Sequence, residues 1–426
     1  MMGEVGFFPR NAVEAAAVSA RADDGNVRPS TMYGLLLALA ITGYPIASAF
    51  TTVLVIEGSL VSYIFRLTVI FLAAAVFVRA MTARLLYAAS PLILLFLILY
   101  LTRLYVDFFV RELPEAGYSL LYFLGICVLP AAGLTAAAQY YEEKRAAICM
   151  LFVAGLGASS ALLLNALQLT SYASLTEETG RLSFASLNAI AVGYTGLFLM
   201  IAAASLWGRL AMPWKLGLLP AALIGAICLV QAASRGPIVA GVVCVAALAY
   251  VRRQWFLFFV LAALVVYGAA VAHTEDFAII DRFQNLSSDL SATERQISML
   301  ISIEQALASP IFGHAYVETI TFTYPHNLLI ESGLALGVLG FVLMLFIQVK
   351  LLLFALRLLR EGRRLFPFLT LVAVVNANLS AALFGAADFW IVASISFAFL
   401  HGEKVRRTAA LQGRATSAAS PAYSAQ

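Results

Sequence analysis

The sequence predicts an all-α polytopic membrane protein with about twelve transmembrane helices. Of the 426 residues, 62% are hydrophobic and only 12% are charged, and the mean hydropathy is +0.92. Soluble domains carry about 25% charged residues. Apolar runs of about 20 residues, long enough to cross a hydrocarbon core as a helix, recur along most of the chain. This composition excludes a soluble protein and gives no indication of a nucleic-acid partner.

The predicted spans follow one another through short connections, with one long interruption. We place them at about 31–52, 59–79, 84–102, 117–138, 146–170, 186–207, 216–233, 237–251, 254–272, 326–350, 365–384 and 387–402. Residues 1–30 form a polar N-terminal tail, 31–272 hold the first nine helices, and 273–325 form one large loop. Residues 326–402 hold the last three helices, and 403–426 form a tail rich in Ala and Ser that we expect to be disordered.

The basic residues orient this arrangement in the membrane. Most of the 27 Lys and Arg residues fall in the two tails and in one alternate set of loops. Apart from Arg66, which lies inside the second span, only six are assigned to the opposite side: Arg103, Arg111, Arg181, Arg235, Arg282 and Arg295. The positive-inside rule places the basic set in the cytoplasm. We therefore expect both termini in the cytoplasm and the loop 273–325 outside it.

Several of these extracytoplasmic arginines have acidic residues close by in the sequence. Arg103, Arg111 and Arg282 share short segments with Asp107, Glu112 and Asp281. We interpret them as surface arginines or ion-pair partners. Arg181 lies close to Glu177 and Glu178, so by itself it is a weak indication of a site, and Asn188 follows it just before the sixth span.

Two arginines are stronger candidates. Arg235 lies in QAASRGPIVAG, a tight turn between two spans with no acidic residue nearby in the sequence. A guanidinium near the bilayer is costly without an anion, so it binds either an anionic ligand or a distant carboxylate. Arg295 lies near the start of a predicted amphipathic helix in the large loop, where a positive charge opposes the helix dipole. That position favours a functional role, and an ion pair with Glu294 or Glu304 is the alternative.

One of only four histidines stands at the start of the tenth span, in TYPHNLLIESGLALGVLG. Pro325 suits the first turn of a helix, so we expect His326 in that turn. Asn327 and Glu331 are four residues apart and are expected to share one helix face. A histidine is neutral near pH 7 and can act as a general base. The alternative is an interfacial histidine that caps the helix.

The spacing of His326 and Asn327, then nine residues, then Gly337 and Gly340 resembles the signature of O-antigen ligases and the related pilin-type O-oligosaccharyltransferases. The context is similar as well, with one large loop before the tenth span. Two positions depart from the family's pattern. Residues 313–315 are Gly-His-Ala where related proteins often have Gly-x-Gly, and residues 187–189 are Leu-Asn-Ala where they tend to have Asn-Pro-Asn.

The resemblance implies a GT-C-like glycosyltransferase of the bacterial inner membrane, with its active site facing the periplasm. Such an enzyme transfers polysaccharide from an undecaprenyl-diphosphate-linked donor to a sugar hydroxyl of lipid A–core in lipopolysaccharide biosynthesis. The implied catalytic residues are His326 as base and Arg235 and Arg295 on the diphosphate. The implied substrate-binding residues are Arg181, Asn188, Asn327, His314 and Glu331, with Asn327 or Glu331 orienting the histidine.

No metal or other cofactor is expected. The outer-face residues Asp276, Asp281 and Asp289 are scattered in the sequence, and arginine forks can bind phosphate bidentately without a metal.

Three alternatives remain open. An O-antigen polymerase would use the same kind of donor with another glycan chain as acceptor. A pilin-type oligosaccharyltransferase shares the signature but is typically longer. A lipid or solute transporter, which belongs to a different class, would place ionisable groups near the membrane midplane, where this chain places only Arg66. The gathering of candidate residues on one face favours an enzyme.

Overall fold

The structure is a computed structural model that describes residues 29–54, 58–82, 90–167, 182, 188–254 and 290–401. Within these ranges the chain is helical and contains no strand. The helices are α2 (Pro29–Thr42), α3 (Tyr44–Leu54), α4 (Gly58–Thr82), α5 (Pro91–Phe109), α6 (Ala116–Tyr122), the π-helix η1 (Phe123–Val128), α7 (Leu129–Ala136), the 3₁₀-helix η2 (Ala138–Tyr140), α8 (Glu143–Ala166), α9 (Ala189–Trp207), α10 (Met212–Gln231), α11 (Arg235–Arg252), α14 (Leu290–Ala308), α15 (Leu328–Arg360) and α16 (Leu365–Leu379). A last helix spans Ala387–His401. Arg181, the two tails and nearly all of the predicted ninth span lie outside the described residues.

Eight helices within the described ranges are long and apolar enough to cross a membrane, or up to nine if a bent pair counts as one span. The protein is therefore a polytopic helical membrane protein, and the number twelve stays a prediction. The bent pair is α2 and α3, which meet at 63° in the middle of the predicted span 31–52. Helix α5 begins at Pro91, a residue suited to the first helical turn, and the predicted start of the third span at 84 lies outside the described residues.

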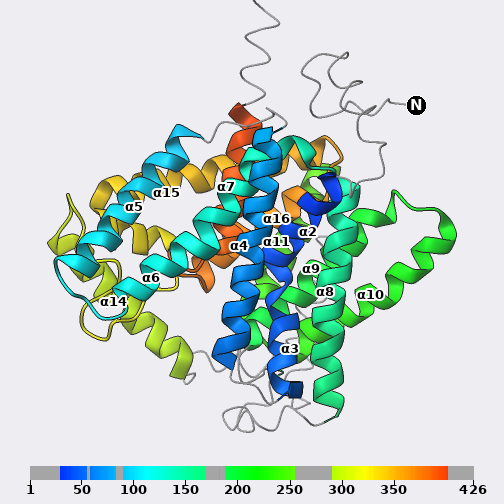
Figure 1. Cartoon of the computed structure of the whole chain (residues 1–426), viewed down its shortest axis with the longest axis horizontal. Helices are drawn as coiled ribbons and strands as arrows, with labels where there is room; N and C mark the ends of the chain where they lie inside the picture. Colours follow the sequence, from blue (N-terminus) through cyan, green and yellow to red (C-terminus); the bar gives the residue numbers. More distant parts are fainter. Residues whose placement is uncertain are drawn as a thin grey trace, which may run out of the picture.

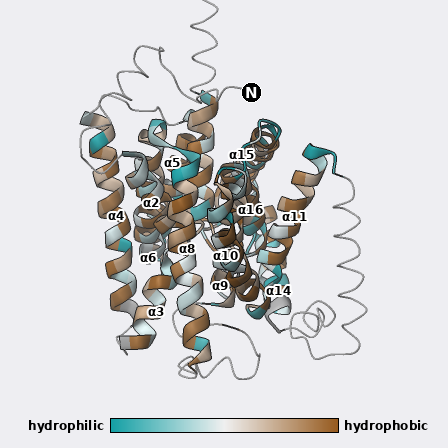
Figure 2. Cartoon of the chain, turned by 90° about the vertical axis from the view of Figure 1, so that its right-hand side faces the viewer, coloured by the Kyte–Doolittle hydropathy of each residue, from teal (hydrophilic) through white to brown (hydrophobic). Residues whose placement is uncertain are grey.

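Figure 1 shows how the helices are arranged in the bundle. Two clusters of buried apolar side chains lie among them. The larger lies among α2, α8, α9 and α16, and its many alanines let these helices pack closely. The smaller lies among α5, α6, α15 and the last helix, and it includes the rings of Phe96, Tyr100, Phe123 and Trp390, which contact one another edge-on or tilted. Hydrophobic residues also run along the outward faces of α4 and α8, and hydrophilic residues gather at helix ends such as that of α11 (Figure 2). An apolar outer surface is what lipid requires.

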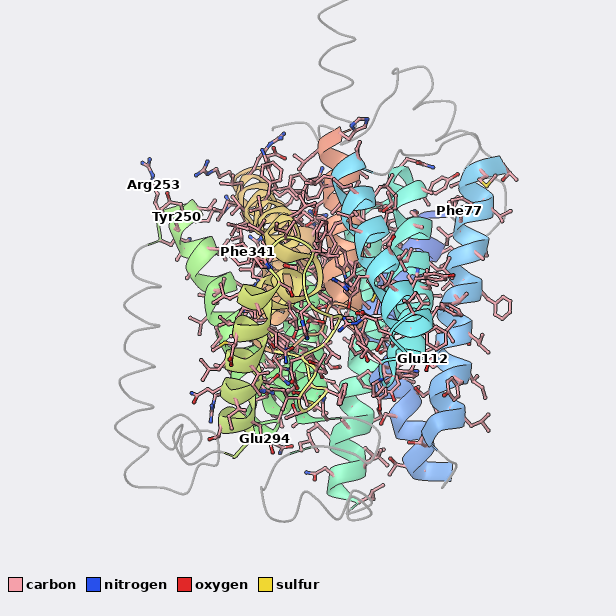
Figure 3. The ribbon with its side chains drawn as sticks, turned by 90° about the vertical axis from the view of Figure 1, so that its left-hand side faces the viewer. Phe77, Glu112, Tyr250, Arg253, Glu294 and Phe341 are labelled. Carbon is pink, nitrogen blue, oxygen red and sulfur yellow. The ribbon has the colours of Figure 1, made fainter. Side chains whose placement is uncertain are left out.

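The two ends of the bundle carry residues that the topology prediction separates. Phe77, Tyr250 and Arg253 lie towards one end, and Glu294 lies towards the other (Figure 3). Phe77 is near the end of α4 and Arg253 follows α11, and both adjoin connections predicted to be cytoplasmic. Glu294 belongs to α14, in the large loop predicted to be extracytoplasmic. The helix directions fit the predicted alternation, and the orientation in a membrane stays a prediction.

Helix α15 is interrupted at Gly337, near its predicted extracytoplasmic end. Gly337 has φ 67° and ψ −158°, a conformation essentially restricted to glycine. The interruption frees backbone groups, and the preceding loop binds them. Val338 N donates to Pro310 O at 2.7 Å, and His314 N donates to Leu334 O at 2.6 Å. At Gly337, the first glycine of the signature, the backbone of the large loop therefore forms the hydrogen bonds that the helix itself leaves unmade.

A buried ion-pair group on α5 holds the same loop. Asp107 is fully buried, and Nη1 of Arg103 and of Arg111 lie 3.6 and 3.1 Å from its Oδ1. Its Oδ2 accepts a hydrogen bond from Tyr316 N at 2.7 Å. Both arginines also donate to backbone carbonyls of the loop or of the break in α15. The predicted pairing of Arg103 and Arg111 with nearby acids is confirmed, whereas Arg282 lies outside the described residues.

Candidate active site

His326 lies in the backbone turn that leads into α15. The helix begins at Leu328, and Asn327 is its N-cap, accepting hydrogen bonds from Leu329 N and Ile330 N at 3.0 and 3.2 Å. The predicted placement of His326 in the first helical turn is therefore wrong, because the histidine precedes the cap. Its φ is +54°, in the left-handed region that non-glycine residues rarely adopt. Residues held in such conformations cluster at functional sites.

Two contacts fix the orientation of the His326 ring. Its Nδ1 lies 3.3 Å from the carbonyl oxygen of Ser380, and its ring packs against that of Tyr324 with centroids 4.4 Å apart. A carbonyl only accepts, so Nδ1 carries the proton, and in the neutral ring Nε2 holds the lone pair. Burial lowers the pKa of His326 and the positive charge of Arg295 lowers it further, outweighing the bond to Ser380. The ring is neutral at pH 7, with Nε2 as its basic nitrogen.

Asn327 and Glu331 do not orient the histidine, contrary to the expectation from sequence. In the part of the chain that the structure describes, neither side chain bonds to the His326 ring. Asn327 Nδ2 instead lies 3.4 Å from Asn378 O, and Oε2 of the fully buried Glu331 accepts from Leu383 N at 2.9 Å. Asn327 therefore contacts the last turn of α16, and Glu331 holds the connection between α16 and the last helix against α15. Their role in substrate binding stays a prediction.

The two arginines predicted to bind the diphosphate approach the start of that connection. Arg295 on α14 donates from Nη1 to Leu379 O at 3.2 Å. Arg235 is the first residue of α11, and its neighbour Gly236 lies against Ser380: a Cβ added to the glycine would be 3.2 Å from Ser380 Oγ. The histidine and both arginines come from three segments far apart in the sequence. The histidine ring, Arg295 and the residue after Arg235 all lie against Leu379 or Ser380 at the end of α16.

The other predicted substrate-binding residues have contacts within the protein. Asn188 is the N-cap of α9, and its side chain accepts a hydrogen bond from the first turn at 2.9 Å. His314 Nε2 lies 3.1 Å from Thr319 Oγ1, and burial and the charge of Arg111 lower its pKa. Arg181 lies outside the described residues. Binding of substrate by these residues stays a prediction. In the described ranges no three His, Cys, Asp or Glu side chains are grouped closely enough to hold a metal ion.

Residues 376–388 contact the site, although no residue of this segment was predicted there. Helix α16 ends at Leu379, so the predicted end of its span at 384 is wrong. Asn378 Nδ2 donates to Gln348 Oε1 of α15 at 2.9 Å. The segment could have been recognised by its polar residues in an otherwise apolar region, which are Asn376, Asn378, Ser380 and Asp388. Polar groups inside membrane segments are expensive and commonly functional.

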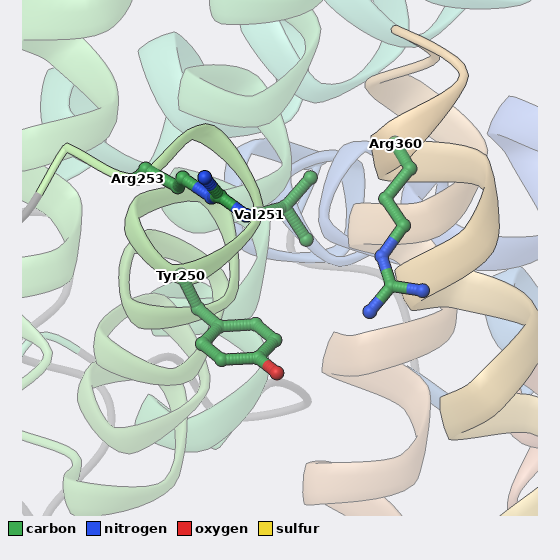
Figure 4. A pocket seen from close by; sticks show the side chains of 4 residues that line it. All are labelled: Tyr250, Val251, Arg253 and Arg360. Atoms are coloured by element: carbon green, nitrogen blue, oxygen red, sulfur yellow. The ribbon is translucent and has the colours of Figure 1, made fainter.

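A cavity lined by Tyr250, Val251, Arg253 and Arg360 lies away from this site (Figure 4). Arg360 ends α15 and His326 precedes its start, so the cavity and the histidine lie at opposite ends of this 33-residue helix. The arginines of the cavity lie at the end predicted to be cytoplasmic, where the positive-inside rule accounts for them. We therefore place the candidate site at the histidine.

The fold and the site define a polytopic α-helical membrane protein with a neutral histidine and two arginines gathered at one end of its bundle. Residues 220–345 match the family model for O-antigen ligase. The match covers less than a third of the chain and agrees with the family that the histidine motif predicted, a family associated with glycosyltransferase-type ligase activity. The matched range includes both candidate arginines and the histidine, and it ends before the connection after α16. A comparison with curated proteins gives no match.

Proposed function

We propose that the protein is an O-antigen ligase that transfers polysaccharide from undecaprenyl diphosphate to a sugar hydroxyl of lipid A–core. The observation that carries this proposal is that His326, Arg295 and the start of α11, where Arg235 is the first residue, all lie against the residues at the end of α16. The reaction needs a base for a hydroxyl and cations for a departing diphosphate, and these three side chains have that chemistry. The topology predicted from the basic residues supports a periplasmic site at the inner membrane.

His326 accepts the proton of the acceptor hydroxyl in this mechanism. The hydroxyl oxygen forms a bond to the anomeric carbon of the donor while its proton moves to His326 Nε2. The bond from the anomeric carbon to the diphosphate oxygen breaks at the same time, and a single displacement of this kind inverts the anomeric centre. The bond from Nδ1 to Ser380 O and the lowered pKa of His326 support this role, because only the neutral ring can accept a proton.

Arg235 and Arg295 neutralise the charge that develops on the departing diphosphate. A guanidinium presents parallel N–H groups that match two phosphate oxygens, and its charge persists at any physiological pH. We propose that this bidentate contact takes the place of a metal ion, so that the reaction needs no cofactor. A lysine at either position would keep the charge and lose the fork geometry.

The test is transfer by the purified full chain in detergent, supplied with undecaprenyl-diphosphate-linked glycan, lipid A–core and excess EDTA. Wild type should retain activity in EDTA, and His326→Ala should lose about 10²–10⁴-fold in rate. Arg295→Lys should lose at least about tenfold, because one bidentate contact becomes a single one. Arg79→Lys is the matched control and should keep full activity, because Arg79 lies in the last turn of α4, at the end of the bundle away from the site.

Each contrary outcome identifies the part of the proposal that fails. Full activity of Arg295→Lys would contradict bidentate binding. Loss of activity in EDTA that a divalent cation restores would contradict the metal-free reaction. Growth of the glycan on its lipid carrier, with lipid A–core unchanged, would identify a polymerase. No transfer by wild type with any of several donors would favour a transporter.

A further inference from the structure

Arg66 lies inside α4, on an outward face made of apolar side chains. It is eight residues after Gly58, which places it about 12 Å from the predicted extracytoplasmic end of the helix. Ile64 and Leu67 beside it are 54% and 51% exposed, and Leu121 on the neighbouring α6 is 72% exposed. This part of the surface faces lipid in a membrane, so Arg66 places a positive charge at the lipid boundary.

The contacts of Arg66 are with tyrosines. Its Cζ lies 4.6 Å from the ring centroid of Tyr122 and 5.9 Å from that of Tyr63, and its Nη1 lies 3.5 Å from the hydroxyl oxygen of Tyr118. Among the described residues, no Asp or Glu forms an ion pair with it. Cation–π contacts offset only part of the cost of a guanidinium at this depth. An anion that arrives through the lipid would offset the rest.

A continuous series of aromatic contacts connects Arg66 to the candidate active site. The ring of Tyr122 packs edge-on against Phe384 with centroids 6.2 Å apart, and Phe384 packs edge-on against Tyr324 at 6.0 Å. Tyr324 in turn packs against His326 at 4.4 Å. These residues come from α6, from the connection after α16 and from the loop before α15. One series of aromatic contacts therefore runs from Arg66 at the lipid boundary to His326 in the candidate site.

The middle of this series is held by specific local structure. The six residues after Tyr122 form the π-helix η1, a rare geometry that is frequent at functional sites. Cys127 within η1 has its Sγ 3.3 Å from Phe384 O. Gly385 also lies against α6, because a Cβ added to it would be 4.0 Å from Tyr122 Cε1. The π-helix and these contacts fix Phe384 between the two tyrosines.

We propose that Arg66, Tyr118 and Tyr122 bind the phosphate-bearing head of a lipid substrate at the boundary of α4 and α6, and that the aromatic series leads its sugar to His326. A guanidinium and a phenol hydroxyl donate hydrogen bonds to phosphate, and tyrosine suits the membrane interface. The inference rests on the proposed function, in which donor and acceptor are both phosphorylated lipids. Arg295 on α14 and the start of α11 already lie beside the residues at the end of α16 that contact the histidine, so the separate approach from α4 and α6 favours the acceptor.

The test compares the wild-type chain with Arg66→Gln and Arg66→Lys, with Arg79→Gln on the same helix as the matched control. Transfer is measured against acceptor concentration and, separately, against donor concentration. Arg66→Gln should raise the KM for lipid A–core by about tenfold with little change in kcat, because a charged hydrogen bond to phosphate is lost. Arg66→Lys should raise it less, and Arg79→Gln should leave it unchanged.

A second measurement does not depend on activity. Native mass spectrometry of the purified chain compares retention of lipid A with that of lipid A whose phosphates have been removed. Wild type should prefer the phosphorylated lipid, and Arg66→Gln should lose that preference. Equal retention of both lipids by wild type and variant would overturn the proposal. If wild type transfers nothing, the proposed function fails, and this comparison still decides whether the lipid site exists.

The kinetic outcomes separate binding from a structural role. A rise in the donor KM in place of the acceptor KM would also support a site for lipid phosphate and would identify the donor as its ligand. Unchanged KM values for both substrates would overturn the proposal. A fall in kcat alone, accompanied by a lower melting temperature, would also overturn it, because a residue that only stabilises the packing of α4 produces that result.

Discussion

Replacing Gly337 with alanine tests whether the break in α15 is required. With φ 67° and ψ −158°, the residue lies in a region that side chains with a Cβ occupy at a cost of about 1–3 kcal/mol. The added Cβ would lie 2.4 Å from Ile311 O and 2.5 Å from Pro310 O, so the backbone of the loop would have to move. Overpacking of this kind costs about 1–3 kcal/mol. Together the two contributions lower the free energy of unfolding by about 2–6 kcal/mol.

The assay is thermal melting of the purified variant in detergent, followed by the transfer reaction. Because the displaced loop continues into His326, we expect a lower melting temperature and loss of transfer. Gly217→Ala in α10 is the matched control: a Cβ there meets no atom within 4 Å, and alanine favours a helix more than glycine does. A Gly337→Ala protein that melts and transfers like wild type would refute the reasoning, because α15 could then close without the loop.

Three further predictions concern protonation, a buried charge and a helix cap. Burial and the charge of Arg295 lower the pKa of His326 below its usual 6.5. We therefore expect kcat/KM to fall only as the pH drops through that lowered value. An inflection of kcat/KM above pH 6.5 would contradict a neutral base. Because of the same lowered pKa, the unfolded chain binds a proton at His326 more readily than the folded chain does, so this histidine should reduce stability as the pH falls below 6.5. The melting temperature of His326→Ala should therefore depend less on acid pH than that of wild type. Asp107→Asn leaves Arg103 and Arg111 beside a neutral amide and should lower the free energy of unfolding by about 3–5 kcal/mol. An unchanged melting temperature would show that these ion pairs are dispensable. Asn188→Ala should lower the free energy of unfolding by about 1 kcal/mol, because it removes the N-cap of α9, whereas Asn188→Ser should retain stability. Loss of transfer by the serine variant would indicate that Asn188 contacts substrate.

The positions of many helices could be predicted because hydrophobicity acts along the chain. Helices α8 and α9 lie on the predicted spans 146–170 and 186–207, where apolar residues are continuous. The bend at Gly43 could not be read in the same way, because it lies within an apolar run. The end of α16 at Leu379 was missed as well, although Asn376, Asn378 and Ser380 interrupt the apolar residues there. The end of α16 depends on neighbouring segments that bind its backbone, such as the side chain of Arg295 on Leu379 O.

Composition and the distribution of arginine were sufficient to identify a polytopic membrane protein, and the spacing of His326, Asn327 and Gly337 was sufficient to predict the O-antigen ligase family that the match to residues 220–345 supports. These are properties of short stretches and can be read without a fold. The partners of those residues came from the packing of the helices. Asn327 contacts the last turn of α16, Glu331 holds the connection after it, and the break at Gly337 lets the backbone of the large loop bond to α15. The carbonyl of Ser380, 54 residues from His326 in the sequence, sets the tautomer of the histidine. Every residue has a backbone carbonyl, so only its position in space makes this one part of the site.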